Sequence, residues 1–111
     1  MKISLGILCA GLLMQALSGP ASATEAGQAV YQKWCSHCHD AGVNYPGTLA
    51  LEARYKGAVP AALLERDNLT PEFVAYFVRN GISVMPFFRK TEISDDELQA
   101  LGEYLANPTK E

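Results

Sequence analysis

The stretch Cys35-Ser36-His37-Cys38-His39 decides how the rest of this sequence is interpreted. Two thiols three positions apart, followed at once by an imidazole, form the pattern through which haem is attached covalently to a protein. On one helical turn, Cys35 and Cys38 can each form a thioether with a haem vinyl group. His39 then lies beneath the ring and offers a nitrogen to the iron as the proximal ligand. The motif therefore predicts one haem c, bound through Cys35 and Cys38.

Two other interpretations of the Cys-x-x-Cys pair fit the sequence less well. A thioredoxin-type redox pair needs a βαβ setting, and no convincing strand pattern surrounds these cysteines. A structural zinc site needs four ligands, and Cys35, Cys38, His37 and His39 are too crowded to close a tetrahedron. His37, inside the attachment turn, is expected to point away from the iron and to lie at the surface.

Residues 1–23 have the features of a secretory signal peptide. Lys2 gives a positive start, residues 3–17 are an apolar run, and Ala21-Ser22-Ala23 is an Ala-x-Ala cleavage site. The run is shorter than the roughly 20 residues that a membrane span requires. We expect cleavage after Ala23, export to the periplasm and no membrane span in the mature chain; an uncleaved anchor is the alternative.

The mature chain, residues 24–111, is expected to form one small domain. The full sequence has a formal net charge of −3, so nothing in it is basic enough to favour nucleic-acid binding. Cleavage removes one of the three cysteines, and the two that remain belong to the attachment motif. A chain of this size buries only about 60–65% of its unfolded surface, so an apolar cofactor would add much to its core.

The spacing of apolar residues predicts an all-α fold without repeats. Residues 24–35 are predicted to form a helix, in which Gly27 marks either the close approach of a second helix, which we expect, or a frayed N-terminus. Thr70 is the predicted cap of a helix that ends at Asn80-Gly81. Ser94 and Glu97 form a capping-box pattern at the start of the last helix. The remaining expectations are a loop over 40–47, a short helical turn over 49–56, a brief helix over 60–66 and an irregular loop over 82–90.

Met85 decides between two kinds of haem chemistry. It is the only methionine of residues 24–111, and Pro86 favours an extended conformation at Met85. Ligation by histidine and methionine is the arrangement of electron-transfer cytochromes, whereas His39 alone would leave the iron open to oxygen or peroxide. We therefore expect His39 and Met85 to bind the iron and the protein to carry electrons rather than to catalyse a reaction. A buried core methionine is the alternative.

Other residues are expected near the cofactor. A haem-ligating histidine usually donates its second ring N–H to a carbonyl or carboxylate, and Pro46 could provide that carbonyl or be a simple turn proline. Leu49 is expected at the haem wall, together with Phe73, Phe77 and Leu98, although all four would also fit an ordinary core. The segments expected at the haem edge are Ala41, Gly42, Val43 and Asn44 on one side and Val84, Phe87 and Phe88 on the other.

These features resemble the class I cytochromes c across residues 24–111. Gly27 and Tyr31 lie eight and four residues before Cys35, as in the first helix of that family. Leu101-x-x-Tyr104-Leu105 resembles the closing helix that crosses it, and Pro46 matches the proline whose carbonyl holds the proximal histidine. The resemblance implies a small monohaem fold in which the N- and C-terminal helices cross around a covalent haem.

A narrower resemblance covers residues 77–81, Met85-Pro86-Phe87-Phe88 and residues 94–97. These stretches are similar to the cytochrome subunits of p-cresol methylhydroxylase and of related eugenol and alkylphenol hydroxylases. In that family a periplasmic FAD protein oxidises a 4-alkylphenol, and the cytochrome takes the electrons singly. The resemblance implies an FAD-containing dehydrogenase as electron donor and a further redox protein as acceptor. Residues 54–68 form a longer segment than that family has.

Two other functions stay open at the level of sequence. One is a free electron shuttle for another periplasmic dehydrogenase or for a terminal oxidase. The other is a ligand-binding or peroxidase-like haem protein in which Met85 is displaced from the iron.

Overall fold

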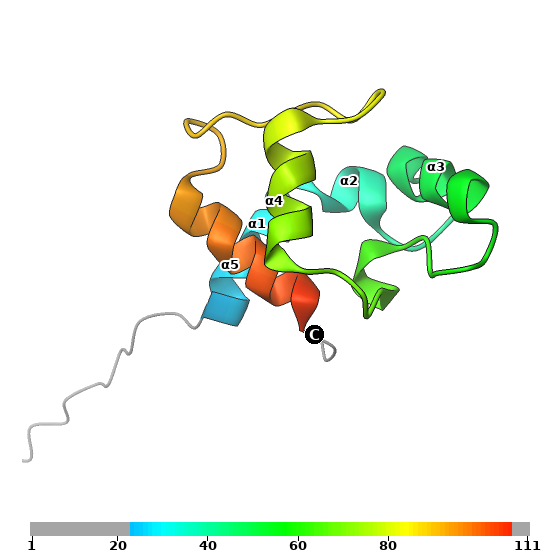
Figure 1. Ribbon diagram of the computed structural model, residues 1–111, viewed down its shortest axis with the longest axis horizontal. Helices are drawn as coiled ribbons and strands as arrows, with labels where there is room; N and C mark the ends of the chain where they lie inside the picture. The colour runs from blue at the N-terminus through cyan, green and yellow to red at the C-terminus, as the bar shows by residue number, and fades with distance from the viewer. Residues whose placement is uncertain (1–22, 108–111) are drawn as a thin grey trace, which may run out of the picture.

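The computed structural model describes residues 23–107 (Figure 1). Within this range the chain forms five α-helices and one 3-10 turn, and no β-strand. The predicted all-α class is therefore confirmed. The predicted signal peptide lies outside the described residues except for Ala23, at which the first helix begins. The elements are α1 (Ala23–Trp34), α2 (Ser36–His39), α3 (Pro46–Tyr55), the 3-10 turn Leu63–Glu65, α4 (Pro71–Asn80) and α5 (Asp95–Ala106).

Helices α1 and α5 pack against each other, and Gly27 lies at their contact. A Cβ atom on Gly27 would overlap the carbonyl oxygen of Ala100 and would lie 2.5 Å from the Cβ of Tyr104. The two backbones can approach this closely only because glycine carries no side chain. The rings of Tyr31 and Tyr104 also meet between these helices, with centroids 6.1 Å apart. The predicted close approach at Gly27 is confirmed.

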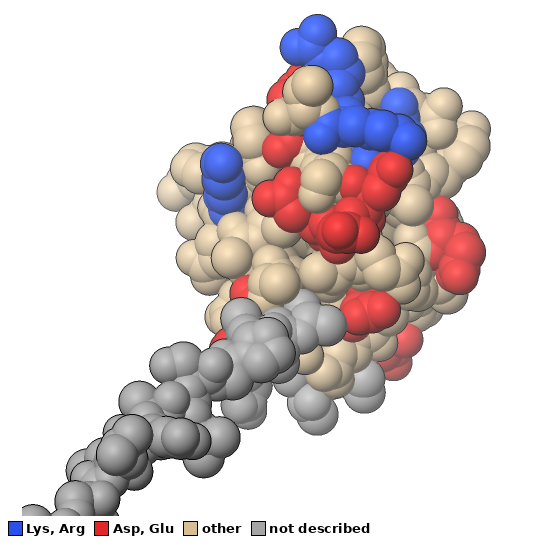
Figure 2. All heavy atoms as spheres, turned by 90° about the vertical axis from the view of Figure 1, so that its left-hand side faces the viewer, with Lys and Arg blue, Asp and Glu red and all other residues tan. Residues whose placement is uncertain are grey.

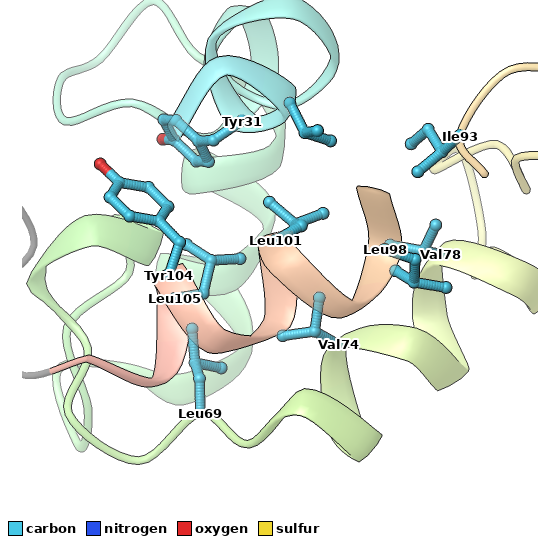
Figure 3. Close-up of a cluster of buried hydrophobic side chains, with 10 residues drawn as sticks. Tyr31, Leu69, Val74, Val78, Ile93, Leu98, Leu101, Tyr104 and Leu105 are labelled. Carbon is cyan, nitrogen blue, oxygen red and sulfur yellow. The ribbon is translucent and has the colours of Figure 1, made fainter. Parts of the chain in front are cut away.

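The hydrophobic core joins α1, α4 and α5 (Figure 3). Leu101 and Ile93 are completely buried in it. Leu98, one of the possible haem-wall residues, is buried in this core. In Figure 1, α2 and α3 lie on the other side of α4 from α5, while Trp34 and Cys35, at the attachment turn, pack against the edge of the core.

The two helix starts predicted from capping residues are confirmed. The Thr70 side chain accepts a hydrogen bond from the N–H of Phe73 at 3.2 Å at the start of α4. At the start of α5, Ser94 Oγ accepts from the N–H of Glu97 at 3.1 Å, and the Glu97 carboxylate accepts from the N–H of Ser94 at 2.8 Å. Each bond satisfies an N–H group that the helix itself leaves without a partner.

The middle of the chain differs from the prediction. Helix α3 begins at Pro46, inside the expected loop, because proline suits the first helical position, where no N–H is needed. The helix predicted over 60–66 is wrong, since only the 3-10 turn Leu63–Glu65 forms there. The buried guanidinium of Arg66 lies 5.1 Å from the Tyr55 ring centroid and donates to Asn68 at 3.0 Å. Side-chain contacts therefore hold this segment in place of regular helical bonds.

Candidate haem site

The predicted attachment residues lie on one short helical turn. The N–H of Cys35 donates to the carbonyl of Tyr31 at 2.8 Å, which carries the helical path of α1 into α2. The N–H groups of Cys38 and His39 both donate to the carbonyl of Cys35, at 3.1 and 3.0 Å. The backbone of α2 thus fixes the positions of both thiols relative to the imidazole. His37 is exposed, as predicted.

The two cysteines are free thiols in different surroundings. Cys35 is partly buried and Cys38 is exposed. Burial, with a smaller contribution from the charge of Cys38, raises the pKa of Cys35 to about 12. Among residues 23–107, no three His, Cys, Asp or Glu side chains gather closely enough to hold a metal ion. The attachment turn therefore carries two free thiols, and burial favours the protonated form of Cys35.

The His39 imidazole is partly buried. Burial lowers its pKa below the ordinary value of 6.5 and so favours the neutral ring, the form that binds a metal. Its Nδ1 atom is buried and has no hydrogen-bond partner. The predicted bond from His39 to the carbonyl of Pro46 is not formed in this structure. A partly buried imidazole beside two free thiols nevertheless fits the chemistry of haem attachment and axial ligation.

Gly47, in the first turn of α3, lies directly against this imidazole. A Cβ atom at Gly47 would lie 2.7 Å from the carbonyl oxygen of Cys38 and 2.9 Å from His39 Nδ1. Both distances are too short for a real Cβ, so only glycine fits here without displacing its neighbours. No sequence pattern indicates this role, because Gly47 follows a proline in a stretch that was predicted to be a loop.

Asp40, directly after His39, joins the attachment turn to two helices. Its carbonyl accepts a bond from the buried Thr48 hydroxyl of α3 at 2.8 Å. Its carboxylate accepts a bond from the Tyr31 hydroxyl of α1 at 2.7 Å. Burial first, and then this carboxylate, raise the pKa of Tyr31 well above its ordinary range. These contacts, which the sequence did not predict, hold the chain on the C-terminal side of His39.

Met85 lies in the predicted irregular loop between α4 and α5. Ile82 and Met85 exchange two backbone hydrogen bonds, at 3.2 and 2.9 Å, so the loop closes on itself. Phe88 packs edge-on against the Trp34 ring with centroids 5.6 Å apart. Phe87 is 59% exposed, so the two adjacent aromatic residues have different environments. Met85 itself is partly buried.

Large apolar side chains are exposed on the elements beside the two turns. On α3, Leu49 is 48% exposed, and on α4, Phe73 is 43% exposed. Exposed apolar side chains on neighbouring elements are a surface that a large apolar cofactor can cover. Other exposed apolar residues lie in the segments expected at the haem edge, namely Val43, Val84 and Phe87.

Comparisons with known proteins place the chain in a family. Residues 22–105 match the family model described as cytochrome C oxidase, cbb3-type, subunit III. The chain belongs to this cytochrome c family. It is also 31% identical over 102 residues to the 4-cresol dehydrogenase [hydroxylating] cytochrome c subunit of Pseudomonas putida, with 91% of this chain and 77% of that protein covered. No solved structure gave a significant match.

The predicted class I cytochrome c and its small all-helical fold are thereby confirmed. The cytochrome is an electron carrier whose cofactor is haem c. Within residues 23–107, none of its helices has the length and apolar character needed to cross a membrane.

Proposed function

We propose that this cytochrome accepts single electrons from an FAD-dependent 4-alkylphenol dehydrogenase in the periplasm and passes them to a further redox protein. The observation that carries this proposal is the 31% identity to the cytochrome c subunit of 4-cresol dehydrogenase. A flavin oxidises its substrate by two electrons at once, so the enzyme needs a partner that removes electrons singly. On its own the cytochrome catalyses no reaction.

In this proposal, Cys35 and Cys38 form the thioethers and His39 and Met85 are the two iron ligands. Haem, when bound, supplies a one-electron redox centre. Pro46 begins the helix that contacts His39, and Leu49 covers part of the cofactor. A methionine in the second axial position raises the reduction potential, which suits an electron acceptor.

Residues 1–23 are proposed to be a signal peptide that is cleaved after Ala23, and residues 24–111 to be the cytochrome domain. Export would carry the chain to the compartment where thioethers form. Both thiols, Cys35 and Cys38, must be reduced when the thioethers form. Mass spectrometry of the mature protein tests the cleavage site and the covalent haem together.

Copurification tests the proposed partner. We expect an affinity-tagged cytochrome, isolated gently from its own host, to bring with it a flavoprotein. Addition of 4-cresol to that complex should reduce the haem. A preparation that contains no flavin, or whose haem stays oxidised with 4-alkylphenols, would contradict the proposal.

The family match favours a second candidate. Its description refers to a subunit of a cbb3-type oxidase, and a free cytochrome could deliver electrons to such an enzyme. Reversible, weak binding to a terminal oxidase, without a copurified flavoprotein, would support this second function over the first.

A further inference from the structure

Arg79, in the last turn of α4, binds three separate acceptors around the loop that carries Met85. Its Nη1 donates to the carbonyl of Phe88 at 3.1 Å and to the carbonyl of Ile93 at 2.9 Å. Its Nη2 donates to the Asp95 carboxylate at 2.9 Å. One guanidinium thus joins the end of α4, the segment after the methionine and the first residue of α5.

Both backbone polar groups of Phe88 form hydrogen bonds with α4. Its N–H donates to the carbonyl of Val78 at 2.7 Å, while its carbonyl accepts from Arg79. Its ring packs edge-on against Trp34 of α1. The loop between Gly81 and Phe88 therefore leaves α4 and returns to the last turn of the same helix. Met85 is held within this closed loop, only three residues from Phe88.

The two carbonyl bonds are the important part of this arrangement. The Arg79 side chain is 23% exposed, whereas the Asp95 side chain is 64% exposed and also binds Lys90 at 2.8 Å. Exposed ion pairs contribute little, because water and salt screen them. The hydrogen bonds from the less exposed guanidinium to the two carbonyls therefore contribute more than the exposed ion pair does.

We infer that Arg79 is a positioning residue for Met85. Its bonds to the carbonyls of Phe88 and Ile93 hold these residues against α4. They thereby keep the loop in a conformation in which the Met85 thioether can reach the haem iron. This inference rests on the proposed ligation of the iron by Met85. The guanidinium fork is required, because a lysine ammonium cannot present several donors in one plane.

The test compares Arg79→Lys, Arg79→Ala and Asp95→Asn in the haem-loaded protein. The weak far-red band of a methionine–ferric iron bond reports Met85, and far-ultraviolet circular dichroism reports the helices. We expect both Arg79 variants to lose the band at a lower temperature than the wild type while the helical signal persists. Ferrous Arg79→Lys should bind carbon monoxide at least about tenfold faster, since two charge-assisted hydrogen bonds no longer restrain the loop. Asp95→Asn, which keeps both carbonyl bonds, should keep the wild-type band and the wild-type rate of carbon monoxide binding at room temperature.

Each other outcome contradicts the inference. If Arg79→Lys keeps the wild-type band and carbon monoxide rate, Arg79 does not position Met85. If the band and the helical signal are lost together, Arg79 stabilises the whole fold and has no particular effect on the loop. An equal effect of Asp95→Asn would assign the role to the ion pair. A wild-type protein without the band would instead overturn the ligation by Met85, and this inference with it.

Discussion

The absence of a side chain at Gly47 leaves room for the His39 imidazole. The substitution Gly47→Ala tests whether this close contact determines the position of the ring. Gly47→Ala must push apart the first turn of α3 and the attachment turn, because its Cβ would lie 2.7 Å from the Cys38 carbonyl oxygen. Such overpacking costs about 1–3 kcal/mol of folding free energy. We expect lower stability in denaturant titrations and a shifted haem reduction potential, since the proximal ring must move.

Gly27→Ala is the matched control for this change. Its Cβ would collide with Ala100 and Tyr104 at the contact of α1 and α5, and it would leave His39 untouched. We expect a similar loss of stability and an unchanged potential. Equal potentials in wild type and Gly47→Ala would show that Gly47 has no influence on the proximal ligand.

Replacement of Met85 tests the second iron ligand. We expect Met85→Ala to abolish the far-red band, to lower the reduction potential and to open the ferrous iron to carbon monoxide, because a weaker ligand or none replaces the thioether. Optical titration with carbon monoxide measures the last effect. Rapid binding of carbon monoxide by the wild type would instead favour a ligand-binding haem protein.

The sequence reveals residues whose chemistry depends on spacing along the chain, but not those that act through contacts in space. Cys35, Cys38 and His39 form a local motif, so their proposed role follows from the sequence directly. Gly47 and Arg79 carry no such pattern. Their roles appear only when α3 is seen to meet α2, and when the segments after α4 are seen to fold back on it.

The start of α5 offers a prediction about pH. Asp95 is exposed, and hydrogen bonds first from Lys90 and then from Arg79 lower its pKa below the ordinary value of 3.8. Because the pKa is lower in the folded state, these contacts add stability above pH 3.8 that is lost as the pH falls through the folded-state value. We expect Asp95→Asn to lower the melting temperature slightly at neutral pH and to equal the wild type at about pH 2.

Asp96→Asn is the control for this prediction. It removes the same charge from the same helix end, where either carboxylate interacts favourably with the helix dipole. Among the described residues, however, Asp96 forms no ion pair with Lys90 or Arg79. If both variants lose the same stability at neutral pH, the helix dipole rather than the contacts of Asp95 explains the effect.

Helices were predicted correctly where capping residues mark their starts, and wrongly where contacts between side chains determine the local conformation. Thr70 and Ser94 have local partners three residues away, so α4 and α5 were predicted to within about a residue. Residues 60–66 contain a proline followed by apolar residues, which suggested a helix. The Arg66 guanidinium stacks on the Tyr55 ring, which lies in the preceding helix, and no pattern in the local sequence predicts this contact.

The surface of the whole molecule bears on docking. On the face drawn in Figure 2, basic side chains adjoin acidic ones, and Lys90 and Arg79 pair with Asp95. By contrast, Val43, Val84 and Phe87 are exposed beside the attachment turn and the Met85 loop. Exposed apolar and aromatic side chains are typical anchors of protein interfaces. We therefore propose that the flavoprotein docks on an apolar surface around the haem edge.

Such docking should depend weakly on salt. We expect the affinity of the separated flavoprotein for the cytochrome to change little between low and high ionic strength, measured by titration calorimetry. Val84→Asp should weaken binding, because it buries a charge in an apolar contact. A loss of affinity by orders of magnitude in high salt would indicate docking through the carboxylates instead.

We propose that this cytochrome receives electrons one at a time from a flavoprotein that removes two electrons from each substrate molecule. The most direct measurement is an anaerobic titration of the oxidised cytochrome, in excess over the copurified flavoprotein, with a 4-alkylphenol. We predict that each molecule of substrate reduces two molecules of cytochrome, within the time of enzyme turnover. Substrate oxidation without reduction of the haem would contradict it.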